Sequence, residues 1–265
     1  MRSAALGAFI ILFGVAAVLA GPSSDEMNAS NNPLQPAIGL NFQDYYTGSF
    51  YGLDDADANA FLLRGVVPHK LFGHPQIVRG TLPIVTSPDL GVPDSDTAIG
   101  DFNIFDIFLF KAGKVELGFG PQLTIPTATL DETGTGKWQA GAAALIMAPH
   151  KWGMVGGLLT WQTSFAGDDD RPDQDNLQIQ PLFIYNLPKG WYFRSTALLT
   201  WDLERDTHYL PVGAGAGKIW KGSGIVWNAF VEPQWTVSHD GDGVPKLQIF
   251  TGLNLQFPVN KGGRP

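Results

Sequence analysis

The segment Leu247-Gln-Ile-Phe-Thr-Gly-Leu-Asn-Leu-Gln-Phe257 alternates between two kinds of side chain. Its odd-numbered positions carry Leu, Ile, Thr or Phe, whereas its even-numbered positions carry Gln, Asn or Gly, with one Phe. Successive side chains of a β-strand point to opposite faces of the sheet, so this period of two predicts a strand with one apolar and one polar face. An apolar face suits lipid and a polar face suits water, which is the pattern of a transmembrane β-barrel.

The same alternation recurs upstream, for example at residues 227–238 and 191–204. From residue 38 onward such segments are bounded by Gly, Pro, Asp or Asn, and none has a convincing helical period. We therefore predict an all-β chain that forms a transmembrane antiparallel barrel of about twelve strands. The predicted strands are residues 38–51, 59–67, 75–86, 99–110, 114–126, 136–148, 153–166, 176–187, 190–203, 208–220, 225–238 and 246–257.

The connections between these strands alternate between short and long. Residues 111–114, 187–190 and 221–224 are short connections, whereas residues 167–175 form a longer acidic one. Barrels of this kind have short periplasmic turns and longer outside loops, so an even strand count puts both termini in the periplasm. The exception is the predicted turn at residues 68–74, which is long for that side. The predicted outside loops are residues 52–58, 87–98, 127–135, 167–175, 204–207 and 239–245.

The N-terminus has the layout of a cleaved export signal. Arg2 precedes an apolar run, and small residues end at Ala20 before Gly21 and Pro22. This predicts a signal peptide over residues 1–20, although a membrane-anchoring helix is the alternative reading. We expect residues 21–37, rich in Ser, Asn, Asp and Pro, to be a flexible periplasmic lead-in. The barrel then covers residues 38–257, and residues 258–265 form a C-terminal tail.

Composition excludes several classes of protein. The chain has no cysteine, which excludes a lipoprotein anchor and a disulfide framework. Only 16% of its residues are charged, against roughly 25% in a soluble domain, so much of its surface must face something other than water. The net charge of -8, without any basic cluster, excludes nucleic acid as a partner. The predicted location is the cell outer membrane, reached through the periplasm.

Tryptophans fall near the predicted strand ends, where aromatic side chains collect at the two membrane interfaces. A soluble β-sandwich would bury these side chains in its core, and it would leave long edge strands unprotected. We expect two interface girdles. The short-turn girdle comprises Trp191, Trp220 and Trp227, and the long-loop girdle comprises Trp138, Trp161, Trp201 and Trp235.

Polar residues on the inward faces are the candidates for function. A barrel of about twelve strands lies between the eight that side chains can fill and the sixteen that leave a water channel. These residues therefore either line a passage or pair with one another and fill the lumen. The main candidates are Arg64, Arg79, Glu116, Lys137, Gln139, Gln180, Arg194, Asp202, Asn228, Glu232 and Gln234, and we assign Asp106, Gln122, Gln162 and Gln178 to the same face.

No catalytic or metal-binding pattern stands out, and we predict neither an enzyme nor a cofactor. Asp202 and Glu204 share a face but lie at a loop rim, and the acidic residues 168–175 lack the spacing of a calcium loop. His69 and His74 could meet across a turn, yet no histidine pair has metal-ligand spacing on one strand. A Gly-x-Ser-x-Gly elbow and a His-x-Ser pair are both missing, since Gly241 follows His239 at the second position.

Five stretches of the chain carry a resemblance to a known family. They are Gly100-Asp-Phe-Asn-Ile-Phe-Asp106, Gly118-Phe-Gly-Pro-Gln-Leu-Thr-Ile-Pro-Thr127, Gly134-Thr-Gly-Lys-Trp-Gln-Ala-Gly141, and residues 161–170 and 181–194. Together they resemble a family of outer-membrane transporters, the family named for the MetA pathway of phenol degradation, whose bacterial members are often labelled neuromedin U. The resemblance covers most of residues 75–257 and implies an outer-membrane barrel associated with uptake of hydrophobic or aromatic compounds. It supplies no set of functional residues.

The leading hypothesis is a channel or transporter for small molecules, and the alternative is a closed structural or surface-interaction barrel. The expected partners are outer-membrane lipid and lipopolysaccharide, the solute, and the barrel-assembly machinery. A hydrophobic or aromatic solute would require a continuous apolar track inside the barrel. Candidates for that track are Phe108, Phe110, Leu182 and Phe230.

Overall fold

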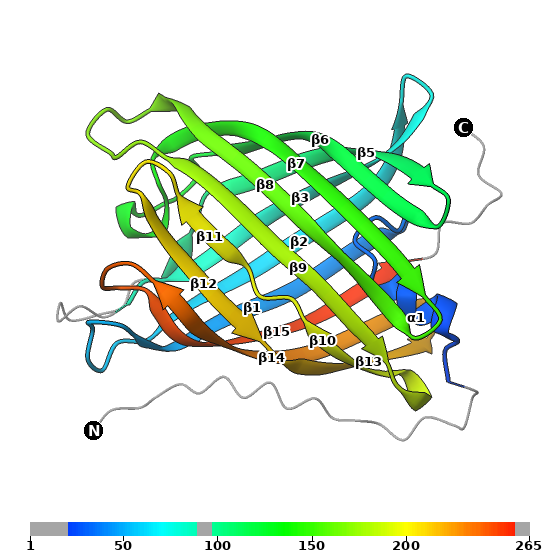
Figure 1. The fold of residues 1–265 in the computed structure, drawn as a ribbon. Helices are drawn as coiled ribbons and strands as arrows, with labels where there is room; N and C mark the ends of the chain where they lie inside the picture. The colour runs from blue at the N-terminus through cyan, green and yellow to red at the C-terminus, as the bar shows by residue number, and fades with distance from the viewer. Residues whose placement is uncertain (1–20, 89–96, 258–265) are drawn as a thin grey trace.

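A computed structural model describes residues 21–88 and 97–257 of the chain. They form a closed antiparallel β-barrel with a short helix at one end (Figure 1). The predicted signal peptide, residues 1–20, and the tail, residues 258–265, lie outside the described residues. The strands are β1 Ile38–Phe50, β2 Ala58–Leu71, β3 His74–Thr86, β4 Thr97–Ile99, β5 Phe102–Ala112, β6 Val115–Ile125, β7 Lys137–His150, β8 Gly153–Gly167, β9 Asp175–Asn186, β10 Trp191–Ser195, β11 Leu199–Asp202, β12 Thr207–Gly213, β13 Gly215–Gly222, β14 Ile225–His239 and β15 Pro245–Phe257.

These segments make twelve spans, because three spans are interrupted. β4 and β5 both pair with β3, β10 and β11 both pair with β9, and β12 and β13 both pair with β14. Each of the three pairs of segments is therefore one span. β1 pairs with β15 along its whole length, with Ile38 opposite Phe257, which closes the barrel. The predicted all-β barrel of about twelve antiparallel strands is confirmed.

The alternation in the sequence corresponds to the two faces of the wall. Leu253 and Leu255 in β15 lie opposite Phe42 and Leu40 in β1 on the outer face. Asn254 lies opposite Asn41 on the inner face. Because side chains alternate along each strand, one register places a whole set of polar residues inside. Among residues 21–88 and 97–257, no helix is both long and apolar enough to cross a membrane.

The predicted long turn at residues 68–74 is wrong. β2 continues through Pro68 to Leu71, which pairs with His74, so only Phe72 and Gly73 form the turn. Both have positive φ, 51° and 80°, as in the primed two-residue turns that match the twist of a hairpin. Pro68 suggested a break, because proline cannot donate to the strand ladder. The connection at this end is therefore short, like the others there.

Part of the predicted lead-in, residues 21–37, is helical, because α1 spans Ser24–Asn31. Ser23 and Glu26 form a reciprocal capping box at its start, and this Ser-x-x-Glu spacing was visible in the sequence. Met27 and Leu34 pack into the core cluster with side chains from the barrel. Figure 1 shows α1 at the end where the β7–β8 turn and the first residues of β1 lie.

The inner core lies next to α1 and is tightly packed. Met147, Met154, Ile184, Tyr192 and Ile219 are almost completely buried there. The Tyr192 ring fits here only because the facing residue in β13 is a glycine, which has no side chain. A Cβ added at that position, Gly217, would lie 2.2 Å from Tyr192 Cζ.

We predict that Gly217→Ala lowers the free energy of unfolding by about 1–3 kcal/mol, because overpacking a well-filled core forces neighbouring groups to move. Unfolding of the refolded barrel by urea, followed by tryptophan fluorescence, measures the change. Gly65→Ala is the matched control, because a Cβ there would meet nothing within 4 Å. Equal stability of the two variants would contradict the packing derived for Tyr192.

Candidate functional site

The strand register places the main predicted lumen-lining residues on the inner face. Arg64 lies opposite Asn41, Arg194 opposite Ile184, and Glu232 opposite Phe250. The strand pairings also place the other candidates at inward-facing positions of their strands. These are Arg79, Glu116, Lys137, Gln139, Gln180, Asp202, Asn228 and Gln234. Whether they border a solute route stays a prediction.

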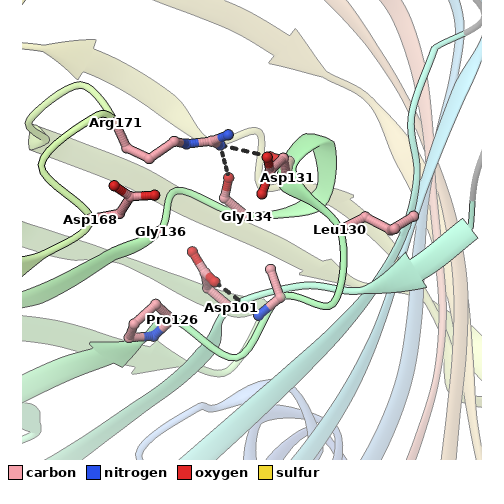
Figure 2. A pocket seen from close by; sticks show the side chains of 9 residues that line it. Asp101, Pro126, Leu130, Asp131, Gly134, Gly136, Asp168 and Arg171 are labelled. Carbon is pink, nitrogen blue, oxygen red and sulfur yellow. Dashed lines mark hydrogen bonds between the residues drawn. The ribbon is translucent and has the colours of Figure 1, made fainter.

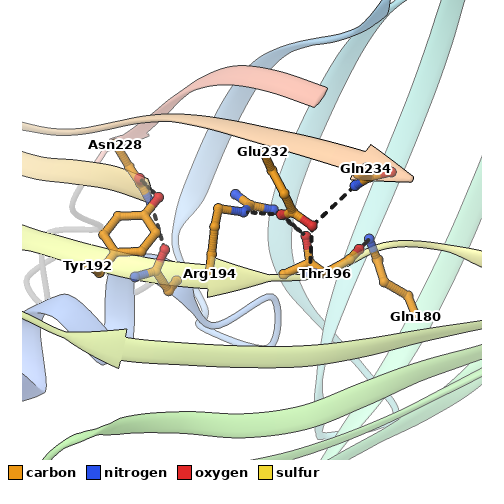
Figure 3. Close-up of polar contacts among 8 residues, drawn as sticks. Gln180, Tyr192, Arg194, Thr196, Asn228, Glu232 and Gln234 are labelled. Atoms are coloured by element: carbon orange, nitrogen blue, oxygen red, sulfur yellow. Dashed lines mark hydrogen bonds and ion pairs between the residues drawn. The ribbon is translucent and has the colours of Figure 1, made fainter. Parts of the chain in front are cut away.

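An ion pair between Arg194 and Glu232 is the centre of the inner network (Figure 3). Arg194 Nε donates to Glu232 Oε2 at 2.6 Å, and its guanidinium also donates to Thr196 Oγ1. Glu232 is completely buried and Arg194 is 8% exposed. A buried charge is tolerated only when it is paired and hydrogen-bonded, so these two side chains require each other.

Thr196 explains why β10 and β11 are separate segments. Its backbone N–H donates to Glu232 Oε1 at 2.7 Å, and its carbonyl accepts from Gln180 Nε2 at 2.9 Å. Side chains thus replace the strand ladder at this point, and the buried backbone groups remain satisfied. Across the gap, a Cβ added at Gly213 would lie 2.1 Å from Glu232 Oε1. The carboxylate therefore fits only where β12 ends in glycine.

Aromatic rings complete the surroundings of Arg194. Its guanidinium carbon lies 3.6 Å from the centroid of the Phe230 ring and 5.3 Å from that of Phe250. Tyr45 stacks on Phe250, with 4.1 Å between ring centroids. These contacts are cation–π and stacking interactions, which favour a guanidinium withdrawn from water.

A second set of contacts holds α1 inside the mouth of the barrel. Tyr192 donates its hydroxyl to Asn228 Oδ1, and Asn228 Nδ2 donates to Asn31 Oδ1 at 3.0 Å. Asn32 donates to Glu116, and Asn28 Nδ2 donates to the carbonyl of His150 at 2.8 Å. The asparagines of this segment were not among the predicted site residues. Their run of polar, helix-neutral side chains suggested a loop.

Between α1 and the Arg194 network lies a cavity of about 160 Å³. It is lined by Arg64, Arg79 and Arg194 together with apolar side chains that include Leu182 and Phe230. Arg64 donates to Gln43 Oε1, and Arg79 lies 4.1 Å from the Phe105 ring. The Nε atoms of Arg64 and Arg79 are buried without a hydrogen-bond partner. Among the residues the structure describes, neither arginine has an acidic partner, so the cavity carries excess positive charge.

Towards the long-loop end the inner face carries a chain of amides. Gln122 donates to Gln162, Gln162 to Gln139, and Gln139 to Thr135, over distances of 3.0, 2.8 and 3.1 Å. Beyond this chain, Lys137 Nζ pairs with Asp173 Oδ1 at 3.1 Å. Hydrogen bonds from Lys137 and Ser164 hold the pKa of Asp173 below its ordinary value.

The acidic loop after β8 is held by local contacts. Arg171 donates to the carbonyls of Asp131 and Gly134, both at 2.6 Å, and so ties the loop to the segment before β7 (Figure 2). Asp101 lies on the other side of a cavity of about 60 Å³ and accepts from the Ala128 and Thr135 backbones. In the part of the chain that the structure describes, no group of acidic or histidine side chains could hold a metal ion.

Three inward assignments from the sequence are wrong. Asp106 lies opposite Val78 on the outer face, where it contacts His69 Nε2 at 2.9 Å. Phe108 and Phe110 share its parity and also face outward, because the strand register in β5 puts the odd-numbered residues inside. Of the proposed apolar track only Leu182 and Phe230 line the inner cavity.

His69 and His74 do not meet. His69 lies opposite Gln76, whereas His74 lies opposite Leu71. The two histidines occupy diagonal rather than facing positions of the β2–β3 hairpin, and the His69 ring contacts Asp106 instead.

All seven predicted girdle tryptophans are on outward positions of the strands. Trp191, Trp220 and Trp227 lie near the short turns, and Trp220 stacks on Trp227 with 6.2 Å between centroids. Trp138, Trp161, Trp201 and Trp235 lie near the long loops. Trp152 was not predicted. It lies in the β7–β8 turn, stacks on His150 and is 39% exposed.

Comparison with solved structures identifies the fold. No family model matches the chain, and no curated protein matches its sequence. The COG4313 outer membrane channel from Pseudomonas putida F1 is similar, with a TM-score of 0.63, 14% identity, and coverage of 86% of this chain and 97% of that one. The KdgM porin gives a TM-score of 0.48 and 8% identity over 84% and 99% of the two chains. The transport unit of the autotransporter AIDA-I from Escherichia coli gives 0.44 and 10% over 89% and 97%.

The chain therefore has the fold of an outer-membrane β-barrel, and the first comparison alone is close enough to carry this conclusion. Closure of the barrel satisfies the backbone hydrogen bonds, and apolar residues cover the outer face. These are the two conditions for a β-structure in lipid. The barrel fold confirms the predicted outer-membrane location.

We predict that Glu232→Gln lowers the free energy of unfolding by about 3–5 kcal/mol, because it leaves the buried Arg194 charge without a partner. Replacing both residues, as Arg194→Met with Glu232→Met, is expected to cost less than Glu232→Gln alone. Urea unfolding in lipid vesicles measures both. Asp202→Asn is the control, because its pair with Arg205 is partly exposed and its loss should cost less than about 1 kcal/mol.

Proposed function

We propose that this barrel is a passive channel for small molecules in the outer membrane. The single observation that carries the proposal is the internal cavity, where Arg64 and Arg79 are half-buried, with their Nε atoms fully buried, and have no acidic partner among the described residues. A structural barrel gains nothing from unpaired charge that is partly withdrawn from water, which is costly. A channel uses such charge to attract and select a solute, as rings of Arg or Lys do in anion pores.

The chemistry of the cavity favours a solute with an anionic group and an apolar body. Arg64 and Arg79 supply donors for a carboxylate or a similar anion, and an arginine fork can bind it in a bidentate manner. Leu182, Phe230 and Phe250 line the same space and favour apolar groups. The cavity is smaller than a typical ligand pocket, so passage requires a change at the barrel mouth where α1 lies.

The finer assignments from the sequence are part of this proposal. They are membership of the MetA-pathway family, termini in the periplasm, contact with lipopolysaccharide, and insertion by the assembly machinery. The resemblance of residues 100–106 and 118–127 supports the first. The alternation of short turns and long loops supports the second, because the first and last barrel residues, Ile38 and Phe257, lie at the short-turn end. In the same reading, the main function is transport rather than catalysis.

The alternative is a closed barrel that serves as a surface-interaction protein. The observations in its favour are the buried Arg194–Glu232 pair and α1, which together fill part of the lumen. Deleting residues 168–175 separates the two functions. A channel should keep its conductance without this loop, whereas a surface-interaction protein should lose binding to lipopolysaccharide vesicles.

We predict discrete, anion-selective conductance when the purified full barrel is inserted into planar bilayers. Replacing both cavity arginines, as Arg64→Gln with Arg79→Gln, should lower the anion-to-cation permeability ratio several-fold, because the positive charge of the cavity is lost. The reversal potential under a potassium chloride gradient measures the ratio.

A matched control removes two positive charges outside the lumen, as Lys114→Gln with Lys189→Gln. Both lysines are exposed in short turns, so selectivity should stay as in the unmodified barrel. A barrel that stays sealed under all conditions would refute the channel. Equal selectivity in the two double variants would refute the role of the arginines.

We also predict that α1 limits conductance and that acid releases it. Glu26 pairs with Lys221, and hydrogen bonds from Lys221 and the Ser23 backbone lower the pKa of Glu26 below 4.5. The stabilisation of α1 by the ionised Glu26 carboxylate is fully present above pH 4.5 and is lost as the pH falls through the lowered folded-state pKa. Conductance should therefore rise below about pH 4.5.

Glu26→Gln should raise conductance already at neutral pH and remove much of the acid response. Asp25→Asn is the control, because Asp25 is exposed on the same helix and no ion pair involves it among the described residues. Unchanged conductance in the Glu26 variant at every pH would mean that α1 does not limit the passage.

A further inference from the structure

Three side chains with complementary chemistry meet at the long-loop end of the barrel. His208, near the start of β12, contacts the Ser238 Oγ through Nε2 at 2.6 Å. The other ring nitrogen, Nδ1, pairs with a carboxylate oxygen of Asp240. A hydroxyl, an imidazole and a carboxylate are therefore connected in series.

Strand pairing and backbone contacts hold this group in place. Leu210 lies opposite Ser238, which puts the Ser238 side chain on the outer face of β14. The Asp240 N–H donates to the His208 carbonyl at 3.1 Å, and the His208 N–H donates to Asp240 Oδ2 at 3.0 Å. The carboxylate is thus fixed by the same residue whose ring it contacts. A shift in the register between Leu210 and Pro211 leaves Val237 as a bulge next to Ser238.

This arrangement is specific to His208 among the histidines whose contacts are known. His69 has a carboxylate on one ring nitrogen, and its contacts include no hydroxyl. His239 contacts the Gly241 carbonyl and stacks on Tyr51. His208 alone has a hydroxyl on one nitrogen and a carboxylate on the other. In an acyl-transfer triad the histidine needs both contacts, one to accept the proton and one to fix its orientation.

We propose that Ser238, His208 and Asp240 form a hydrolytic site for fatty acyl esters on the outer wall of the barrel. Ser238 is the nucleophile, His208 is the general base and then the general acid, and Asp240 orients the imidazole. This activity goes beyond transport and does not depend on the channel. It adds a catalytic role that the sequence analysis did not predict.

The surface around the site indicates the substrate class. His208 lies opposite Trp201, which faces outward, and Trp235 and Val237 on β14 are 47% and 64% exposed. These apolar groups lie at the long-loop end of the wall, where lipid chains meet polar headgroups. An ester with an acyl chain in the membrane can place its carbonyl at Ser238 while the chain contacts this surface.

The reaction proceeds in two steps, acylation of Ser238 and hydrolysis of the acyl-serine. Ser238 Oγ bonds to the ester carbonyl carbon as its proton moves to His208 Nε2, and the bond from that carbon to the alcohol oxygen then breaks. His208 returns the proton to the departing alcohol, which leaves an acyl-serine. A water molecule loses a proton to His208 and bonds to the acyl carbon, and the bond to Ser238 Oγ then breaks. The products are a fatty acid and an alcohol, and Ser238 regains its proton.

The test is covalent labelling of the folded full barrel in detergent with an alkyl fluorophosphonate, a probe that reacts with activated serines. The expected result is one adduct, located by mass spectrometry on Ser238, together with hydrolysis of p-nitrophenyl octanoate. Ser238→Ala should abolish labelling and hydrolysis. His208→Gln should slow labelling by about a hundredfold or more, and Asp240→Asn should slow it as well.

Ser164→Ala is the matched control. Ser164 is half-buried near the same end and bonds to Asp173 and the Gln174 backbone, with no imidazole among its contacts. Its loss should leave labelling unchanged. Migration of heated and unheated samples in electrophoresis confirms that each variant is folded. An unmodified barrel without any adduct on Ser238 would overturn the proposal, as would hydrolysis equal to that of the Ser238→Ala variant.

Discussion

The closed ring of inter-strand hydrogen bonds is the constraint on which this structure depends. Lipid offers no partner for a backbone N–H or carbonyl, so every span must pair on both sides. The pairing of β1 with β15 meets this requirement, and it fixes which residues face lipid. Once Ile38 is opposite Phe257, the period of two assigns apolar residues to the wall and polar residues to the interior.

Inside the ring, burial of charge produces the irregular features. The completely buried Glu232 carboxylate needs more partners than one guanidinium supplies, and it recruits the Thr196 backbone as well. That contact interrupts the wall between β10 and β11, and the carboxylate occupies space left by Gly213. The interruptions between β10 and β11 and between β12 and β13 are therefore consequences of one buried group, the Glu232 carboxylate. They lie next to the cavity with Arg64 and Arg79, where the charge is not neutralised.

The sequence predicted what local patterns determine. Each of the twelve predicted strands overlaps one observed span, because alternation is a property of neighbouring residues. The turn at Phe72 and Gly73 was missed because Pro68 was read as a break. Asp106 was assigned to the wrong face, because the alternation of one strand does not by itself show which of its two faces points into the barrel. Helix α1 was missed as well, because it is held by contacts to residues distant in sequence, such as the hydrogen bond between Asn31 and Asn228, which no local pattern reveals.

The same reasoning explains why Ser238 and His208 escaped a search for motifs. A motif search finds residues at fixed spacing, but strand pairing in a barrel joins residues at spacings set by the loops between them. Here β12 and β14 are neighbours because β13 continues the span of β12, and this brings His208 beside Ser238. Outward side chains at a loop end have little packing to satisfy. A serine, a histidine and an aspartate in series at such a place, with reciprocal backbone bonds between His208 and Asp240, therefore point to chemistry rather than to stability.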